Sequence, residues 1–568
     1  MWRQKKNSTP TNRLNILVSV VLLIGVLIGV RLFFLQIIMK DYYEAKAKGQ
    51  QSVNLILEPR RGNIYLKNKN GEEVAAASTE QGDTLYLNNK FIIDSGGLLE
   101  KLNAVTPIDK DIFSKAISKA NDPYEILKRR VTQEEADKIL ALAIPGVELE
   151  SSSWRVYPAG DFLSHVLGFV GSSATGGADE GRYGIEKYYN NILAGDSSLV
   201  TADKDAKGFL IAIVNPLRSD PGGGEDVRLT IDPDLQKFIE TEIEAARSKW
   251  QGKSAGVIIV QPKTGKVLAM AASPSFDPNN YKTEKDLGVF LNPFTQKIFE
   301  MGSVFKPLTM AAALNEGALT ADTTYIDTGE VKIGSATIKN FDGKSHGKQT
   351  MTQVLEESLN TGAVFAMRKL GEQKLKTYFH NYGLGEKLGI DLPGELKGDL
   401  SNLDTGREIE FATASFGQGV AVTPLELAMA LSSLGNGGKL MQPYLKDDQN
   451  RQPVVIRQVI KPETSVTISR MLVDVVDMKL AGGKAKIDSY SVAAKTGTAQ
   501  MPNTGSKGYS GEYLHTFFGY FPAYDPQYLI LLFLERPQGV KYASQSLTDT
   551  FSEITQFIIN YYTLPPDR

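Results

Sequence analysis

Ser303-Val-Phe-Lys-Pro307, followed directly by the run Leu308-Thr-Met-Ala-Ala-Ala-Leu314, marks the start of a helix. Proline lacks the N–H group that would bond four residues back, so it belongs in a first helical turn. Ser303 is therefore predicted near the helix N-terminus, where the helix dipole favours negative charge. Residues three positions apart share a helix face, so we expect Lys306 within reach of the Ser303 hydroxyl.

A serine next to a lysine is a candidate nucleophile with its base. A serine hydroxyl is a poor nucleophile until a neighbouring group takes its proton. A lysine is protonated at neutral pH, so Lys306 can act as a base only where burial or a nearby cation lowers its pKa. An isolated match of this kind is usually a capping serine beside a solvated lysine, and it needs support from elsewhere in the chain.

Two later motifs supply that support. In Ser358-Leu-Asn360, predicted at a helix end or in an interhelical loop, Ser358 is a candidate proton shuttle and Asn360 a candidate ligand for a substrate amide. Lys495-Thr-Gly-Thr498 follows a small-residue stretch predicted as a strand, 491–494, along which a substrate backbone can lie. Its candidate substrate-binding residues are Lys495, Thr496, Gly497 and Thr498, with the lysine and threonine hydroxyls holding a carboxylate. The N–H groups of Ser303 and Thr498 are candidates for an oxyanion hole.

Two of the motifs occur a second time and must be told apart from their copies. Ser345 and Lys348 repeat the Ser-x-x-Lys spacing, but they lie in a polar, glycine-containing segment that fixes no relation between hydroxyl and amine. Lys263-Thr-Gly265 joins two β-rich runs, 256–261 and 266–271, and is predicted as a hairpin turn ahead of the nucleophile.

The order of elements predicts an α/β or α+β fold, with a helix-flanked sheet closed by both ends of the domain. Asp232-Pro233 has the pattern of a helix N-cap followed by proline in the first turn. Helices are expected to dominate 303–380, and a last helix is expected at 547–561. Strands are predicted at 226–231, 256–261, 266–271, 491–494, 515–520 and 528–534. Pro221-Gly-Gly-Gly224 is the clearest candidate domain boundary.

Composition narrows the functional classes. The chain has 568 residues, 42% hydrophobic and 23% charged, which is typical of folded protein. A net charge of −2 argues against nucleic-acid binding. The absence of cysteine excludes disulfides and thiolate chemistry, and the four histidines show no metal-ligand spacing, so no metal or cofactor is expected.

The N-terminus predicts a membrane anchor. Residues 14–30 carry no charge, and the apolar stretch continues beyond Arg31, which is long enough to span a bilayer. Arg3, Lys5, Lys6 and Arg13 precede it, so we expect a cytoplasmic N-terminus and a chain that faces outward beyond the anchor. A cleaved signal peptide is the alternative, but the apolar run is long for one and no small-residue cleavage site follows closely.

The three motifs together are the set that penicillin-binding proteins share with serine β-lactamases. The chain resembles a class B penicillin-binding protein over nearly its whole length. Further motifs that carry this resemblance are Arg155-Val-Tyr-Pro-Ala-Gly160, Gly184-Ile-Glu186, Ser415-Phe-Gly-Gln-Gly419 and Phe518-Gly-Tyr-Phe-Pro522. The organisation that it implies is a cytoplasmic tail (1–13), a transmembrane anchor (14–38), a mixed pedestal domain resembling a dimerisation domain (39–225) and a penicillin-binding transpeptidase domain (226–568).

The resemblance implies a peptidoglycan D,D-transpeptidase in the cell (inner) membrane, with its catalytic domain on the outer side. Ser303 would attack the D-Ala-D-Ala end of a stem peptide, a second stem's amine would resolve the ester, and β-lactams would acylate the same serine. No glycosyltransferase domain precedes the pedestal, which implies a separate polytopic glycosyltransferase and other divisome or elongasome membrane proteins as partners. The short link between Gly184-Ile-Glu186 and the transpeptidase domain favours the division (septal) branch over the elongation branch.

Three alternatives share some of these features. A D,D-carboxypeptidase differs only in using water to resolve the ester. A serine β-lactamase needs rapid hydrolysis, and the only Glu-x-x-Leu-Asn element, Glu356 to Asn360, overlaps the second motif. A non-enzymatic scaffold that activates a glycosyltransferase would tolerate loss of Ser303, Lys306 and Lys495, which are all present.

Overall fold

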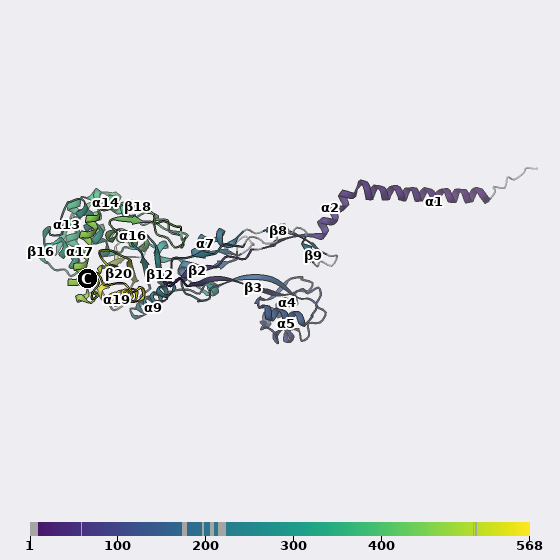
Figure 1. Cartoon of the computed structure of the whole chain (residues 1–568), viewed down its shortest axis with the longest axis horizontal. Coiled ribbons are helices and arrows are strands. Elements are labelled where there is room, and N and C mark those ends of the chain that lie inside the picture. Colours follow the sequence, from purple (N-terminus) through teal and green to yellow (C-terminus); the bar gives the residue numbers. More distant parts are fainter. Residues whose placement is uncertain are drawn as a thin grey trace, which may run out of the picture. The chain divides into compact units, whose positions relative to one another are not determined.

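The computed structural model in Figure 1 describes residues 10–57, 59–172, 179–195, 198–204, 210–213, 223–448, 450–503, 505 and 508–568. Arg3, Lys5 and Lys6 of the basic flank and the start of the predicted boundary at Pro221 lie outside these ranges. The chain forms two units, one from Met1–Pro59 with Gly195–Gly223 and one from Arg60–Ala194 with Gly224–Arg568.

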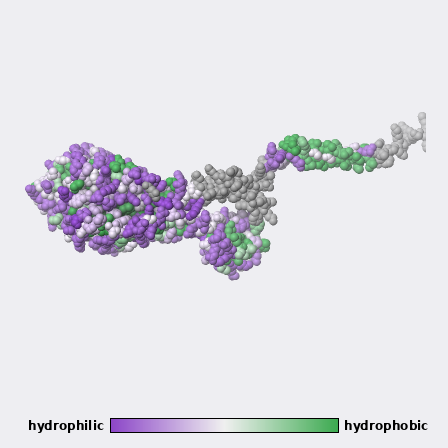
Figure 2. Space-filling model, viewed as in Figure 1, coloured by the Kyte–Doolittle hydropathy of each residue, from purple (hydrophilic) through white to green (hydrophobic). Residues whose placement is uncertain are grey.

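The first unit contains the predicted apolar helix. Helix α1 (Pro10–Phe33) continues through a π-helical turn, η1 (Phe34–Ile38), and α2 (Lys40–Gln51) follows. Leu14–Ile38 has a mean hydropathy of 2.8 and none of it is buried, as the green stretch in Figure 2 shows. It is the one helix in the described part of the chain with the length and composition of a membrane span. Strands β1 (Ser52–Leu57), β8 (Ser198–Lys204) and β9 (Leu210–Ile213) form an antiparallel sheet in the same unit.

The second unit begins with a mixed α/β region. Its strands β2 (Ile64–Lys67), β3 (Glu73–Leu87), β4 (Glu125–Val131) and β5 (Val147–Val156) are antiparallel, with β3 pairing the other three. Helices α3 (Leu98–Asn103), α4 (Lys110–Ser118) and α5 (Gln133–Ala141) contribute buried side chains to a small separate core there. Glu186, on the short helix α7 (Gly184–Tyr188), is fully buried between Arg61 and Arg155.

The larger core surrounds a five-stranded antiparallel sheet of order β12-β11-β21-β20-β19. These strands are β11 (Ser254–Val260), β12 (Val267–Ser273), β19 (Ala493–Pro502), β20 (Tyr509–Phe521) and β21 (Tyr528–Glu535). The early hairpin pairs directly with the last strand, which confirms that both ends of the domain close the sheet. Helix α9 (Pro233–Lys249) begins at the predicted cap, where the Asp232 carboxylate accepts the N–H groups of Asp234 and Leu235.

The remaining helices cover this sheet. Helices α9 and α19 (Thr548–Tyr562) pack together through the stacked rings of Phe238 and Phe557, whose centroids are 4.0 Å apart. Helix α17 (Pro462–Met478) packs against β19, and α16 (Pro424–Gly435) packs against α17 and β21. The other helices of this core are α11 (Lys306–Asn315), α12 (Met351–Glu356), α13 (Asn360–Leu370), α14 (Glu372–Asn381) and α15 (Glu408–Ala414).

Three predicted elements differ from the structure. The segment 303–380 is interrupted by short hairpins built from β13 (Thr324–Asp327), β14 (Glu330–Ile333), β15 (Ala336–Lys339) and β16 (Gly347–Thr350). The strand predicted at 226–231 is only β10 (Val227–Arg228), because Asp232 already caps a helix, and it pairs in parallel with β2 instead of joining the larger sheet. The strand predicted at 491–494 starts at Ala493 and extends to Pro502, so the Lys-Thr-Gly motif lies within it.

Candidate active site

The turn that carries the candidate nucleophile, Ser303, rests on the edge strand of the large sheet. Ser303 lies in a 3₁₀ turn, η5 (Gly302–Phe305), that leads into α11, with Pro307 in the first turn of α11 as predicted. The Thr516 hydroxyl donates to the carbonyl of Met301 at 2.9 Å. A Cβ atom at Gly497 would lie 2.7 Å from that same carbonyl oxygen and 2.3 Å from Thr516 Oγ1. Only glycine at 497 therefore allows β19 to approach the turn that carries Ser303.

The three motifs meet at the Ser358 hydroxyl. The Lys306 Nζ group donates to Ser358 Oγ at 3.2 Å and also to the Ser358 carbonyl. The Lys495 ammonium donates to the same Oγ at 2.9 Å. Two lysines that are far apart in the sequence therefore converge on one hydroxyl, which provides a continuous path for a proton.

The Ser303 hydroxyl stands apart from this network. It has no hydrogen-bond partner among the residues that the structure describes, and it lines a cavity. The direct contact with Lys306 that the helical spacing predicts is not formed, because the Lys306 side chain extends to Ser358 instead. Hydrogen bonds of this kind are often long in unliganded enzymes and tighten when substrate is bound.

Burial disfavours the protonated form of both lysines. Lys306 and Lys495 are 1% and 2% exposed. Burial lowers the pKa of Lys306 well below its ordinary value, and the nearby Lys495 ammonium lowers it further. Burial alone lowers the pKa of Lys495 to about 7. Two ammonium groups beside one hydroxyl repel each other, so this site favours a neutral Lys306, the form that can act as a base.

Ser358 is held in an unusual conformation. It follows α12 and precedes α13, with a φ angle of 54° in the left-handed region. Residues other than glycine seldom adopt this region, and where they do, strain is typical of functional positions. Two residues on, the Asn360 amide Nδ2 donates to the Lys339 carbonyl at 2.8 Å.

A cavity of about 550 Å³ joins these groups to solvent. Of the sequence-predicted residues, Ser303, Ser358, Asn360, Thr496 and Thr498 line it. Lys306, Lys495 and Gly497 do not line it, although both lysines contact Ser358, which does. Because β19 is the outer strand of its sheet, its free edge is available to an extended peptide.

Sequence reasoning assigned no site role to several residues that line this cavity. Thr413, Phe416 and Gln418 come from the end of α15 and the turn that follows. The only signal for them was the Ser415–Gly419 motif, which carried the resemblance but no chemical role. Phe341 and Tyr542 also line the cavity, from loops distant in the sequence, and their rings meet edge to face at 5.5 Å.

The copies of the motifs lie outside the cavity lining. The Ser345 hydroxyl donates to the Asp327 carbonyl at 2.7 Å, while Lys348 lies on β16. Lys263 is in the turn between β11 and β12 and forms an ion pair with Asp525. Among the described residues, no group of three histidine or acidic side chains is arranged to hold a metal ion.

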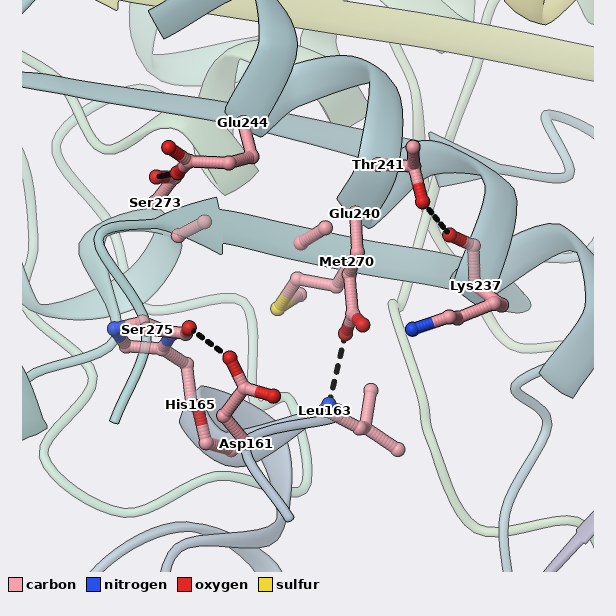
Figure 3. Close-up of a pocket in the computed structure, with 13 residues that line it drawn as sticks. Asp161, Leu163, His165, Lys237, Glu240, Thr241, Glu244, Met270, Ser273 and Ser275 are labelled. Atoms are coloured by element: carbon pink, nitrogen blue, oxygen red, sulfur yellow. Dashed lines mark hydrogen bonds between the residues drawn. The ribbon is translucent and has the colours of Figure 1, made fainter. Parts of the chain in front are cut away.

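A second cavity, of about 370 Å³, lies between α9, β12 and the segment around His165 (Figure 3). Its polar groups hold these segments together. The Glu240 carboxylate accepts the Leu163 N–H at 2.8 Å, and Asp161 accepts the Ser275 hydroxyl at 2.6 Å. Burial lowers the pKa of His165 to about 4, so its ring is neutral near pH 7. No hydrogen bond joins a serine to a lysine among the described residues of this cavity, and we interpret it as a structural junction.

Comparison with known proteins gives consistent results along the whole chain. Residues 255–556 match the family described as the penicillin binding protein transpeptidase domain, and residues 56–229 match the penicillin-binding protein dimerisation domain. Stage V sporulation protein D of Bacillus subtilis is 33% identical over 94% of this chain and 83% of its own length. Peptidoglycan D,D-transpeptidase FtsI of Buchnera aphidicola is 29% identical over 99% of this chain and 97% of its own.

Solved structures share the fold. Penicillin binding protein 2X from Streptococcus thermophilus superimposes with a TM-score of 0.76, covering 89% of this chain and 80% of its own, at 20% identity. Penicillin binding protein 3 from Mycobacterium tuberculosis, complexed with aztreonam, gives a TM-score of 0.66, covering 90% and 98% of the two chains at 22% identity.

Proposed function

The chain belongs to the class B penicillin-binding proteins, the peptidoglycan D,D-transpeptidases, and on this premise we propose that Ser303 carries the acyl-enzyme. The observation that supports this assignment most strongly is the convergence of Lys306 and Lys495 on Ser358 Oγ, in a cavity that Ser303 also lines. A neutral lysine, a hydroxyl and a second lysine give the site a base, a relay and a cation.

The proposed reaction has two half-reactions. Ser303 Oγ attacks the carbonyl between the two D-alanines while neutral Lys306 takes its proton. The C–N bond breaks, and Ser358 passes a proton to the departing D-alanine amine. The amine of a second stem peptide then attacks the ester, forms the cross-link and returns Ser303 to its free state. Lys495, Thr496 and Thr498 hold the terminal carboxylate of the donor, and Asn360 binds its amide backbone.

The assignment of Ser303 is tested by labelling the detergent-purified full chain with fluorescent penicillin. We expect stable labelling that Ser303→Ala abolishes. Ser345→Ala, in the copy of the motif, is a matched control and should label normally because Ser345 lies outside the cavity lining. Labelling that survives Ser303→Ala would overturn the assignment, and rapid spontaneous loss of the label would indicate a hydrolase.

The choice of acceptor is tested separately. A peptide ending in D-Ala-D-Ala is incubated with the enzyme, with and without an amine acceptor, and the products are separated by mass. We expect a cross-linked product in the presence of the amine. Exclusive release of the hydrolysed peptide under both conditions would identify a carboxypeptidase instead.

We propose that 14–38 is the membrane anchor and 1–13 a cytoplasmic tail, with a pedestal (39–225) and a transpeptidase domain (226–568) on the outer side. The apolar, exposed stretch Leu14–Ile38 and the two matched families at 56–229 and 255–556 support these bounds. The chain has no cysteine, so single substitutions report orientation cleanly. A membrane-impermeant maleimide should label Gln133→Cys in spheroplasts and leave Thr11→Cys unlabelled, and the reverse pattern would contradict this topology.

We further propose a polytopic membrane glycosyltransferase as partner, in the division branch, with β-lactams as inhibitors. The branch assignment rests on the short stretch of sequence between Gly184-Ile-Glu186 and the proposed transpeptidase domain. A fluorescent fusion of the full chain should gather at the division site and co-purify with a glycosyltransferase. Uniform labelling of the side wall would favour the elongation branch.

A further inference from the structure

The charged side chains that line the cavity at Ser303 are all positive. Among the described residues that line it, Lys339 and Lys541 are the only charged side chains, and none is a carboxylate. Lys339 ends β15 next to Asn360, which donates to its carbonyl. Lys541 lies two residues before Ala543, whose N–H donates to Thr498 Oγ1 at 3.1 Å. The two lysines therefore flank the two proposed ligands of the donor peptide, the amide-binding Asn360 and the carboxylate-binding Thr498.

The two lysines differ in how much of their charge is already balanced. The Lys339 ammonium lies 3.6 Å from the Glu330 carboxylate on the neighbouring strand. Lys541 forms no ion pair with any residue that the structure describes, and its ammonium lies 5.2 Å from the ring centroid of Tyr542. Its side chain is exposed and free to meet a ligand. Lys541 is therefore the stronger unbalanced charge at the cavity.

The terminal carboxylate of the donor already has a proposed cation, Lys495, so Lys541 is left without a counterion. In the proposed reaction the terminal carboxylate of the donor is bound at Lys495, which contacts Ser358 at the buried end of the network. The cavity, at about 550 Å³, falls in the range of pockets for drug-sized ligands and has room beyond the terminal residues. A second carboxylate, on the residue before the two D-alanines, would lie within the same cavity and would be balanced by Lys541.

We propose that Lys541 is a specificity-determining residue that selects donor peptides with a second free carboxylate over peptides in which that group is a carboxamide. The inference rests on the proposed function, because it concerns the donor of the Ser303 reaction. Lys339 assists more weakly because Glu330 already balances part of its charge. Charge complementarity at a solvent-exposed pair changes affinity modestly, so we expect a preference of about three- to tenfold.

The test uses two probes that differ in one group, the peptides Ac-Ala-Glu-D-Ala-D-Ala and Ac-Ala-Gln-D-Ala-D-Ala. Release of D-alanine by the detergent-purified full chain gives kcat/KM for each. We expect the glutamate peptide to react about three- to tenfold faster, with a ratio that falls as salt is added. Lys541→Met should bring the ratio close to one, and Lys541→Arg should retain it. Lys332→Met, on the neighbouring strand β14 and outside the cavity lining, is the matched control and should leave the ratio unchanged.

The possible outcomes distinguish a failure of the role of Lys541 from a failure of the Ser303 reaction. Equal rates for the two peptides in the unmodified enzyme would overturn the role of Lys541 and leave the transpeptidase assignment intact. The same holds for a preference that survives in Lys541→Met. No release of D-alanine from either peptide, in protein that labels with penicillin, would count against the proposed function itself. Should Lys541→Met fail to fold, Lys541→Gln and the salt dependence of the unmodified enzyme give the same decision.

Discussion

Ser358 combines a conformation that glycine prefers with a hydroxyl that two lysines require. A left-handed conformation costs a residue with a side chain roughly 1–2 kcal/mol, whereas glycine adopts it freely. We therefore expect Ser358→Gly to be more stable than Ser358→Ala by about 1 kcal/mol in urea unfolding. Both variants lose the relay between Lys306 and Lys495, so both should acylate with penicillin at least about 100-fold more slowly. A glycine variant that reacts at the normal rate would show that the hydroxyl is only structural.

The two buried lysines predict a bell-shaped pH profile for acylation. Lys306 must be neutral to act as a base, so the rate should fall as pH drops through its lowered pKa. Lys495 must be protonated to bind a carboxylate, so kcat/KM should also fall as pH rises above about 7. Arginine keeps its charge at every working pH, so Lys495→Arg should lose the alkaline limb even if its maximal rate is lower. Lys263→Arg, in the copy of the motif, is the control, and an unchanged alkaline limb in Lys495→Arg would refute this assignment.

Among the secondary-structure elements, those with strong local signals were predicted well. The Asp232-Pro233 cap, the hairpin of β11 and β12, and the start of α11 at Pro307 are all as expected. Local chemistry decides each of them, through a side-chain cap, a turn or a missing N–H group. The four-residue strands β13–β16 were missed because so short a run has little periodicity.

The three sequence motifs of the candidate site come together in the structure, but the contact expected between Ser303 and Lys306 does not form. Helical spacing placed Lys306 on the same face as Ser303, yet the Lys306 Nζ group donates a hydrogen bond to Ser358 Oγ. That choice depends on the packing of α11, α13 and β19, which a single sequence does not display. Thr413 and Gln418 were missed for the same reason, since they reach the cavity only through the turn after α15.

The mixed region beginning at β2 depends on one buried carboxylate that joins its elements. Glu186 on α7 accepts the Arg61 Nε–H at 2.8 Å and the Arg155 Nε–H at 2.6 Å. Removing one partner of a buried ion pair leaves uncompensated charge and typically costs about 3–5 kcal/mol. We expect Glu186→Gln to lower the free energy of unfolding by about that amount. Glu134→Gln, which removes an exposed pair on α5, should cost less than about 0.5 kcal/mol. A similar small loss in both variants would contradict this account.

At the scale of the larger unit, Glu240 links helix α9 to the chain around Leu163. Its carboxylate accepts the Leu163 N–H at 2.8 Å (Figure 3) and the Gln236 amide, also at 2.8 Å. Burial raises its pKa to about 7, with the Asp161 charge adding to this and Lys237 opposing it. The folded protein therefore favours the protonated acid more than the unfolded chain does. The resulting stability is complete below the ordinary glutamate pKa and is lost as pH rises through about 7.

Glutamine can accept the same two hydrogen bonds without acquiring a charge. Relative to the unmodified protein, Glu240→Gln should therefore gain stability between pH 4.5 and pH 8, by on the order of 3 kcal/mol. Thermal unfolding of the full chain in detergent at several pH values measures this difference, with Glu134→Gln as the control for an exposed carboxylate. If the curves for Glu240→Gln and the unmodified protein run parallel across this range, the carboxylate stays ionised in both states. The junction would then be held by the hydrogen bonds alone.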